Sequence, residues 1–146
     1  AGTGAQEDEL KEKAKSLGLT DGAVQFAGWI DGDRKRELFE NSQALVLPSY
    51  NEGLPVAVLE AISYGMPVVA TDVGDIASAV HDGENGYLIE QGDVDALADA
   101  LAGIDDKTRY ERLSCASREL AEREFNDADY FRRMKDLYRQ AAKEVQ

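Results

Sequence analysis

Two glutamates eight residues apart, Glu52 and Glu60, are the side chains whose type and spacing could do chemistry in this chain. They flank a turn that contains Gly53 and Pro55 and directly follows an apolar run. A carboxylate accepts hydrogen bonds from paired hydroxyl groups, and a glycine lets a ligand approach the backbone. The helix expected there would also turn its first N–H groups toward an anion. Because Glu52 would repel a bare phosphate, the pattern predicts a ligand with a neutral, hydroxyl-rich group beside its anion.

Strands and helices alternate along the chain, which is typical of an α/β fold. Apolar runs predict strands at 23–28, 44–47, 67–70 and 86–89. Helices are predicted at 7–17, 34–41 and 54–64, as one or two turns at 76–80, and from residue 94 onward, with Asp33 and Asp93 as caps. The continuous run 44–47 is expected to be buried on both faces, as in a parallel sheet covered by helices. Ligands of such sheets bind at the carboxyl ends of the strands, where the glutamate turn would lie.

Two later helices carry apolar stripes. The helix that follows Asp93 is expected to bury one face, made up of Val94, Leu97, Ala98 and Leu101. From Asp106 the chain is predicted to be helical to its end, with a break near 125–126. The stripe on the last helix consists of Tyr130, Met134, Leu137, Tyr138, Ala141 and Val145. We expect this helix to pack on the protein with a solvated basic face, rather than to lie on a membrane surface.

Negative charge is concentrated in the middle of the chain. Fourteen Asp and Glu but no Lys or Arg occur from Glu37 to Asp106, and the net charge of the 146 residues is −13. An anion in that segment must therefore be bound by backbone N–H groups or by cations from elsewhere. The acidic balance argues against nonspecific binding of nucleic acid. No basic stretch followed by an apolar one stands at the first residues, and no run reaches eighteen apolar residues, so the pattern predicts neither a signal peptide nor a membrane span.

Other reactive patterns are weak. The turn Gly2-Thr3-Gly4 is followed by Glu7 where a nicotinamide fingerprint needs Gly or Ala, so it predicts a tight turn. His81 and Cys115 are the only residues of their types, which excludes multi-cysteine metal sites and gives no support to a catalytic triad. The sequence therefore predicts no metal site.

The stretch around the two glutamates resembles the signature of the family 4 (group 1) retaining glycosyltransferases, which have a GT-B fold. It reads PSYNEGLPVAVLEA at 48–61 and continues as GMPVVAT at 65–71. The segments FAGW at 26–29 and DGENGYLI at 82–89 are similar to the C-terminal, donor-binding domain of that family. The resemblance implies a Rossmann-like nucleotide-sugar-binding domain at 1–104 and C-terminal helices at 105–146 that pack on it.

The resemblance also implies roles for individual positions. Glu52 would be the catalytic residue, in contact with hydroxyls of the donor sugar near the reacting carbon, and Glu60 would bind the ribose hydroxyls. Backbone N–H groups around Leu54 and Val56, beside Gly53, would hold the sugar or the diphosphate. Pro55, which lacks an N–H, would shape that turn.

Further positions follow from the same resemblance. The loop at Trp29 and Ile30 would lie against the nucleotide base, although plain packing of Trp29 is an equal alternative. No metal or other cofactor would be required, since an Arg and a Lys of the family's first strand and helix stabilise the leaving diphosphate. Those elements would precede Ala1, in agreement with the cation-free segment.

The chain departs from the family pattern in two ways. Asp75 replaces a usual Gly and Ser78 stands where Glu is common, which affects the loop after Thr71. The first, central strand and a helix are also missing, so we expect a fragment of a larger protein with exposed sheet edges. Another chain would fill that gap, or the sheet would be rearranged.

The resulting functional prediction is the donor-binding half of a bacterial, retaining, hexosyl-type glycosyltransferase. Its donor would be a nucleotide diphosphate sugar, and its acceptor a glycan, a lipid or a small molecule, as in polysaccharide biosynthesis. The acceptor-binding N-terminal domain of the same protein would be its partner, and the fragment alone would be inactive. The expected location is the cytoplasm or the inner face of the membrane, with peripheral attachment through the missing domain. Alternatives are a sugar-nucleotide epimerase, a phosphorylase, or a non-catalytic nucleotide-binding or assembly module.

Overall fold

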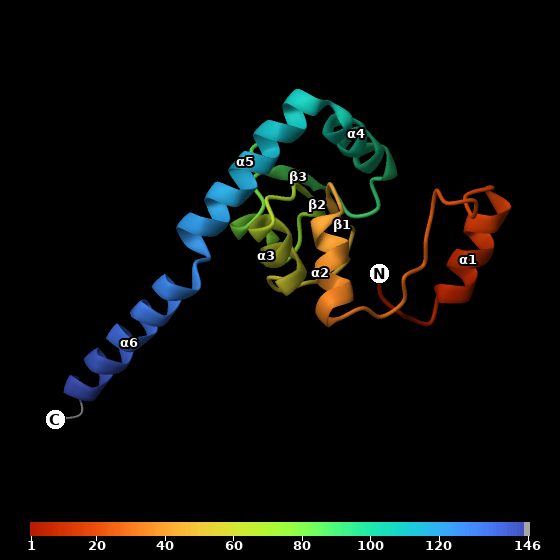
Figure 1. The fold of residues 1–146 in the computed structure, drawn as a ribbon. Helices are drawn as coiled ribbons and strands as arrows, with labels where there is room; N and C mark the ends of the chain where they lie inside the picture. The colour runs from red at the N-terminus through yellow and green to blue at the C-terminus, as the bar shows by residue number, and fades with distance from the viewer. Residues whose placement is uncertain (145–146) are drawn as a thin grey trace. The chain divides into compact units, whose positions relative to one another are not determined.

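The computed structural model describes residues 1–144, which form two compact units. The first unit comprises residues 1–41, and the second begins at Ser42. Figure 1 shows the course of the chain through both units.

The first unit contains two helices, α1 (Glu7–Ser16) and α2 (Gly32–Glu40). In α1, acidic residues occupy the first turn and lysines the last, and Glu7 pairs with Lys11 at 2.6 Å. Helix α2 begins two residues earlier than expected. Asp31 takes the N-cap position, whereas Asp33 lies in the first turn and pairs with Arg36 instead of capping the helix.

The strand predicted at 23–28 is wrong, because this segment forms the end of a turn followed by chain without regular secondary structure. The Gly2 N–H donates to the Gly28 carbonyl at 2.7 Å, but one such bond does not make a strand. Val24 and Phe26 remain exposed, and Ala14 is the one buried residue among 1–41. The segment has the composition of a strand but no neighbouring strand with which to pair.

The second unit contains a parallel sheet of three strands in the order β1-β2-β3. The strands are β1 (Leu45–Leu47), β2 (Val68–Thr71) and β3 (Gly86–Ile89). Val68 is in register with both Leu45 and Gly86. Helix α3 (Val56–Ser63) connects β1 to β2, and the short 3-10 helix η1 (Ile76–Ser78) lies between β2 and β3.

Burial differs sharply between the strands. All four residues of β2 are buried, as expected for a central strand. Strand β1 is not buried on both faces as predicted, because Val46 is 37% exposed and its neighbours are half-buried. Within the described sheet β1 is an edge strand, paired with β2 alone.

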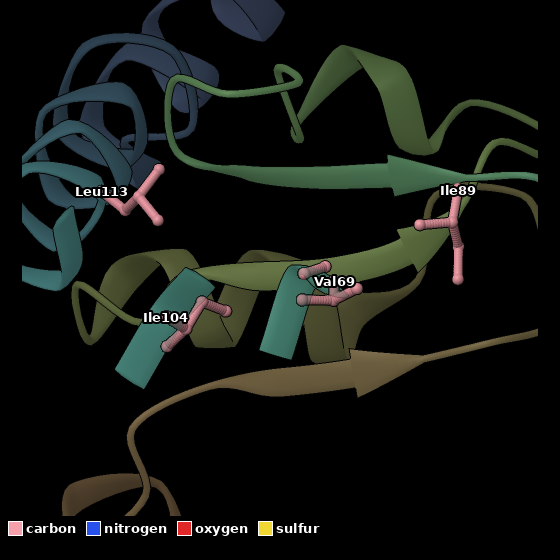
Figure 2. Close-up of a cluster of buried hydrophobic side chains, with 5 residues drawn as sticks. Val69, Ile89, Ile104 and Leu113 are labelled. Atoms are coloured by element: carbon pink, nitrogen blue, oxygen red, sulfur yellow. The ribbon is translucent and has the colours of Figure 1, made fainter. Parts of the chain in front are cut away.

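Helices α4 (Val94–Asp105) and α5 (Lys107–Glu124) complete the core. Figure 2 shows Val69 of β2, Ile89 of β3, Ile104 of α4 and Leu113 of α5, four members of one buried cluster. The stripe predicted for α4 is largely wrong, since Val94 and Leu101 are exposed and the buried positions are Ala100, Gly103 and Ile104. Contacts with α5 and the sheet select this face, which the sequence period alone does not determine.

Helix α6 (Asp127–Glu144) follows the break predicted near 125–126. Its stripe does not pack as expected: Tyr130, Leu137 and Tyr138 are all exposed by more than half of their surface, and Val145 lies outside the described residues. In residues 1–144 no helix is both long enough and apolar enough to cross a bilayer.

Asp93 caps α4 as predicted, and its removal should cost stability. The Ala96 N–H donates to Asp93 Oδ1 at 2.8 Å. We expect Asp93→Ala to lower the free energy of unfolding by about 1 kcal/mol, because one N–H of the first turn loses its acceptor. Urea denaturation would measure the change. Asp99→Ala, which removes the same charge from the middle of this helix, should be neutral or slightly stabilising; an equal loss in both variants would contradict the capping role.

Candidate functional site

The candidate site is built on the motif loop, residues 48–55, which leaves β1 and leads into α3. Since the three strands are parallel, the loops after β1, β2 and β3 emerge at one edge of the sheet. Thr71, at the end of β2, donates its hydroxyl hydrogen bond to the Ser49 carbonyl. Gln91, after β3, donates from Nε2 to the Tyr50 carbonyl at 2.9 Å. The motif loop is therefore attached to both neighbouring loops.

Glu52 lies within this loop and is half-buried. Its Oε1 accepts a hydrogen bond from Ser49 Oγ at 2.8 Å. The backbone of the next residue is bound by the loop after β2, because the Asp75 N–H donates to the Gly53 carbonyl at 3.1 Å. The side chain and the backbone of the glutamate turn thus have separate attachments.

Gly74 packs directly against the glutamate turn. Its φ is +61°, a conformation that L side chains rarely adopt, and a Cβ there would overlap the Glu52 carbonyl oxygen. The same Cβ would lie 2.9 Å from the Gly53 carbonyl oxygen. The sequence reasoning missed this contact. The Gly74-Asp75 pair indicates a turn, but nothing in the sequence states which backbone it approaches.

Helix α3 begins at Val56 rather than Leu54, because Pro55 has the extended φ and ψ of an N-cap residue (−68° and 132°). Pro55 therefore precedes the first helical residue instead of lying within the first turn. No side chain caps this end. The Val58 N–H donates to the Pro55 carbonyl at 3.0 Å, whereas the N–H groups of Val56 and Ala57 precede the first helical hydrogen bond and point toward the edge where the motif loop lies.

Glu60 lies one turn into α3. It follows Val56 by four residues and therefore shares its helix face. The residue is half-buried and its Oε2 atom is buried, whereas Val58, Ala61 and Ile62 form the core side of the helix. One continuous segment thus carries Glu52, the helix N-terminus and Glu60.

Trp29 and Ile30 belong to the first unit, and their relation to the base stays a prediction. Trp29 is 74% exposed. Ile30 lines a hollow of about 370 Å³ together with Arg34 and Asn41. No group of three or more His, Cys, Asp and Glu side chains in residues 1–144 is arranged to hold a metal ion.

The remaining reactive side chains lie away from the motif loop in sequence and have ordinary surface environments. His81 Nδ1 is 3.5 Å from Glu84. Cys115 is exposed, and its hydrogen bond to Glu119 raises the pKa of the thiol. A raised thiol pKa leaves less thiolate, so Cys115 has no features of an activated nucleophile.

Comparison with known proteins gives the family of the chain. The family described as "Glycosyl transferases group 1" matches residues 1–119. The chain belongs to the group 1 glycosyltransferases. Among curated members, the D-inositol 3-phosphate glycosyltransferase of Streptomyces griseus is 34% identical over 114 residues, which are 77% of this chain and 24% of the relative. A glycogen synthase of Mycobacterium tuberculosis is 32% identical over 127 residues, or 86% of this chain and 30% of the relative.

Solved structures of glycosyltransferases share the fold. Sucrose-phosphate synthase from Thermosynechococcus elongatus superposes with a TM-score of 0.85 at 30% identity, over 97% of this chain and 35% of that one. Anabaena HepE in complex with UDP-glucose gives 0.82 at 23% identity, over 95% of this chain and 39% of that one. The predicted class, an α/β fold with a parallel sheet, flanking helices and a helical tail, is confirmed. This group 1 glycosyltransferase chain spans about a quarter to a third of the length of these relatives.

Proposed function

We propose that this chain is the nucleotide-sugar-binding domain of a retaining, hexosyl-type glycosyltransferase. The observation that carries the proposal is that one continuous segment, which starts at the carboxyl edge of the sheet, contains Glu52, the uncapped start of α3 and Glu60. Two carboxylates beside free N–H groups suit a ligand that has both hydroxyl groups and an anion. Solved structures with the same fold were obtained with UDP and with UDP-glucose.

In this proposal each group contacts a different part of the donor. Glu52 accepts hydrogen bonds from sugar hydroxyls near the reacting carbon, and Glu60 accepts them from the ribose. Gly53 leaves room beside the N–H groups of Leu54 and Val56, which hold the sugar or the diphosphate. No metal is needed in this arrangement, because helix N–H groups and cationic side chains stabilise the leaving diphosphate. Those cations come from outside residues 38–106, which contain no Lys or Arg.

The same proposal assigns the rest of the chain and of the protein. Residues 1–104 form the donor-binding domain, and of the helices that follow, α5 packs against it through α3 and α4. An acceptor-binding domain in the remainder of a longer protein supplies the second half of the active site, so these residues alone bind the donor weakly and transfer nothing. The protein is placed in the cytoplasm, and any contact with the membrane is made by the other domain.

Titration calorimetry of the full-length protein with UDP-, GDP- and ADP-sugars tests the function. One class is expected to bind saturably. Glu60→Gln should weaken that binding by about tenfold to 150-fold, the equivalent of about 1.5–3 kcal/mol for a hydrogen bond to a charged group. The variant keeps the shape of the side chain, so the fold should be unchanged.

Glu90→Gln is the matched control. It removes one negative charge just after β3, at the same edge of the sheet, from a side chain with no proposed contact to the donor. Its affinity should stay within about twofold of the wild type. If the folded full-length protein binds no sugar nucleotide, the proposal fails. If both variants weaken binding equally, net charge rather than a ribose contact explains the loss.

A further inference from the structure

Ser49 makes the one direct side-chain contact to Glu52 that the described residues show. Its Oγ lies 2.8 Å from Glu52 Oε1 in a partly buried pair three residues apart. A serine hydroxyl has a single proton to donate, so this hydrogen bond uses Oε1 and leaves Oε2 of Glu52 able to accept a hydrogen bond from a ligand.

Ser49 is itself held from the neighbouring strand. Its carbonyl accepts a hydrogen bond from the hydroxyl of Thr71, which is 1% exposed at the end of β2. Thr71 belongs to β2, the central strand, whose four residues are all buried and close-packed. A chain of two hydrogen bonds therefore runs from the core to the carboxylate of Glu52.

Such a connection restricts the rotation of the Glu52 side chain before a ligand binds. A partly exposed glutamate rotates about three side-chain bonds, and fixing it on a ligand costs rotamer entropy. A carboxylate that is already hydrogen-bonded in one orientation incurs less of this cost when the ligand arrives. Pre-positioning matters most for a group that acts at the reacting atoms, where small displacements lower the rate strongly.

We propose that Ser49 is a positioning residue that orients Glu52 toward the donor sugar, with Thr71 fixing the backbone of Ser49. This inference rests on the proposed function, in which Glu52 contacts the sugar. Ser49 itself touches no substrate in this arrangement, and its effect passes entirely through the glutamate.

The test uses the full-length protein with its sugar-nucleotide donor. Ser49→Ala should lower kcat by about tenfold, the rate equivalent of one hydrogen bond to a charged group, while the Kd of the nucleoside diphosphate stays within about twofold. Ser49→Thr keeps the hydroxyl and should restore most of the rate. Thr71→Val removes the preceding hydrogen bond and should change kcat in the same direction as Ser49→Ala.

Two controls separate positioning from general structural damage. Ser78→Ala removes a hydroxyl that donates to the Asp75 carbonyl in the adjacent loop, and it should leave kcat unchanged. In a Glu52→Ala background, Ser49→Ala should have no further effect on the rate, because the group that Ser49 orients is absent.

The possible outcomes separate failure of the positioning role of Ser49 from failure of the proposed function. If the wild type binds no sugar nucleotide, the proposed function falls and the inference with it. If the wild type is active and Glu52→Gln impairs it, but Ser49→Ala keeps the full rate, Ser49 has no positioning role. A tenfold loss that persists in the Glu52→Ala background would also overturn the inference, since the effect would not pass through Glu52.

Discussion

Replacing Gly74 by alanine is expected to lower the free energy of unfolding by about 2–5 kcal/mol and to abolish donor binding at ordinary concentrations. A φ of +61° costs about 1–2 kcal/mol for a residue with a Cβ. The added methyl would also overlap the Glu52 carbonyl, and overpacking of this kind costs about 1–3 kcal/mol more. Because the groups that the methyl meets are backbone, the strain can be relieved only by moving the motif loop and the loop of residue 74 apart. Urea denaturation and titration with the donor would measure the two effects.

Gly92→Ala is the matched control for this prediction. Gly92 has a similar φ of +77° in the loop after β3, but a Cβ there would have nothing within 4 Å. It should show the conformational cost alone, about 1–2 kcal/mol, and should keep the affinity for the donor. Equal losses in the two variants would mean that the contact with Glu52 contributes nothing.

Glu52→Gln is expected to lower kcat by about 100-fold to 1000-fold, the effect typical of removing one group that stabilises developing charge. The amide keeps the size of the side chain and can still accept the Ser49 hydrogen bond, so the loop should retain its conformation. The proposed contact is to the sugar rather than to the nucleotide, and the Kd of the nucleoside diphosphate should therefore change by less than about threefold. Steady-state kinetics with the full-length protein, combined with calorimetry, would separate the two quantities.

The contrast with Glu60→Gln makes this prediction specific. That variant should weaken nucleotide binding, whereas Glu52→Gln should impair the chemical step. If Glu52→Gln weakens the binding of the nucleoside diphosphate as strongly as Glu60→Gln does, the separate roles proposed for the two carboxylates are wrong. A full rate in Glu52→Gln would show that this side chain does not act in catalysis.

Local patterns in the sequence predict the parts of the fold that depend on local chemistry. The run 67–70 predicts β2 to within one residue, 86–89 predicts β3, and Asp93 predicts the start of α4. The motif around Glu52 and Glu60 likewise predicts a loop and a helix at the carboxyl edge of a sheet. In each case a few neighbouring residues contain the physical reason, whether a cap, an apolar run or a turn.

The features that were missed depend on partners distant in the chain. The run 44–47 reads as a doubly covered strand, yet β1 is an edge strand, because its apolar sequence does not say how many neighbours it has. Segment 23–28 lacks a pairing strand, and α4 buries the face that α5 and the sheet select. Gly74 meets Glu52 across 22 positions of sequence. Long-range contacts of this kind produce no periodic pattern in the sequence. The sequence therefore indicates a turn at Gly74 but not the backbone that this turn contacts.

The absence of Lys and Arg between Glu37 and Asp106 has a consequence for which anions the site rejects. Free phosphate offers no alcohol groups, so at this edge it meets two carboxylates and gains only the weak attraction of a helix end. A sugar nucleotide has hydroxyl groups that can donate hydrogen bonds to both carboxylates. The same negative side chains that repel phosphate would therefore bind the sugar nucleotide. If the proposed donor site is right, these two carboxylates would therefore disfavour the binding of abundant small anions before any cation from the rest of the protein takes part.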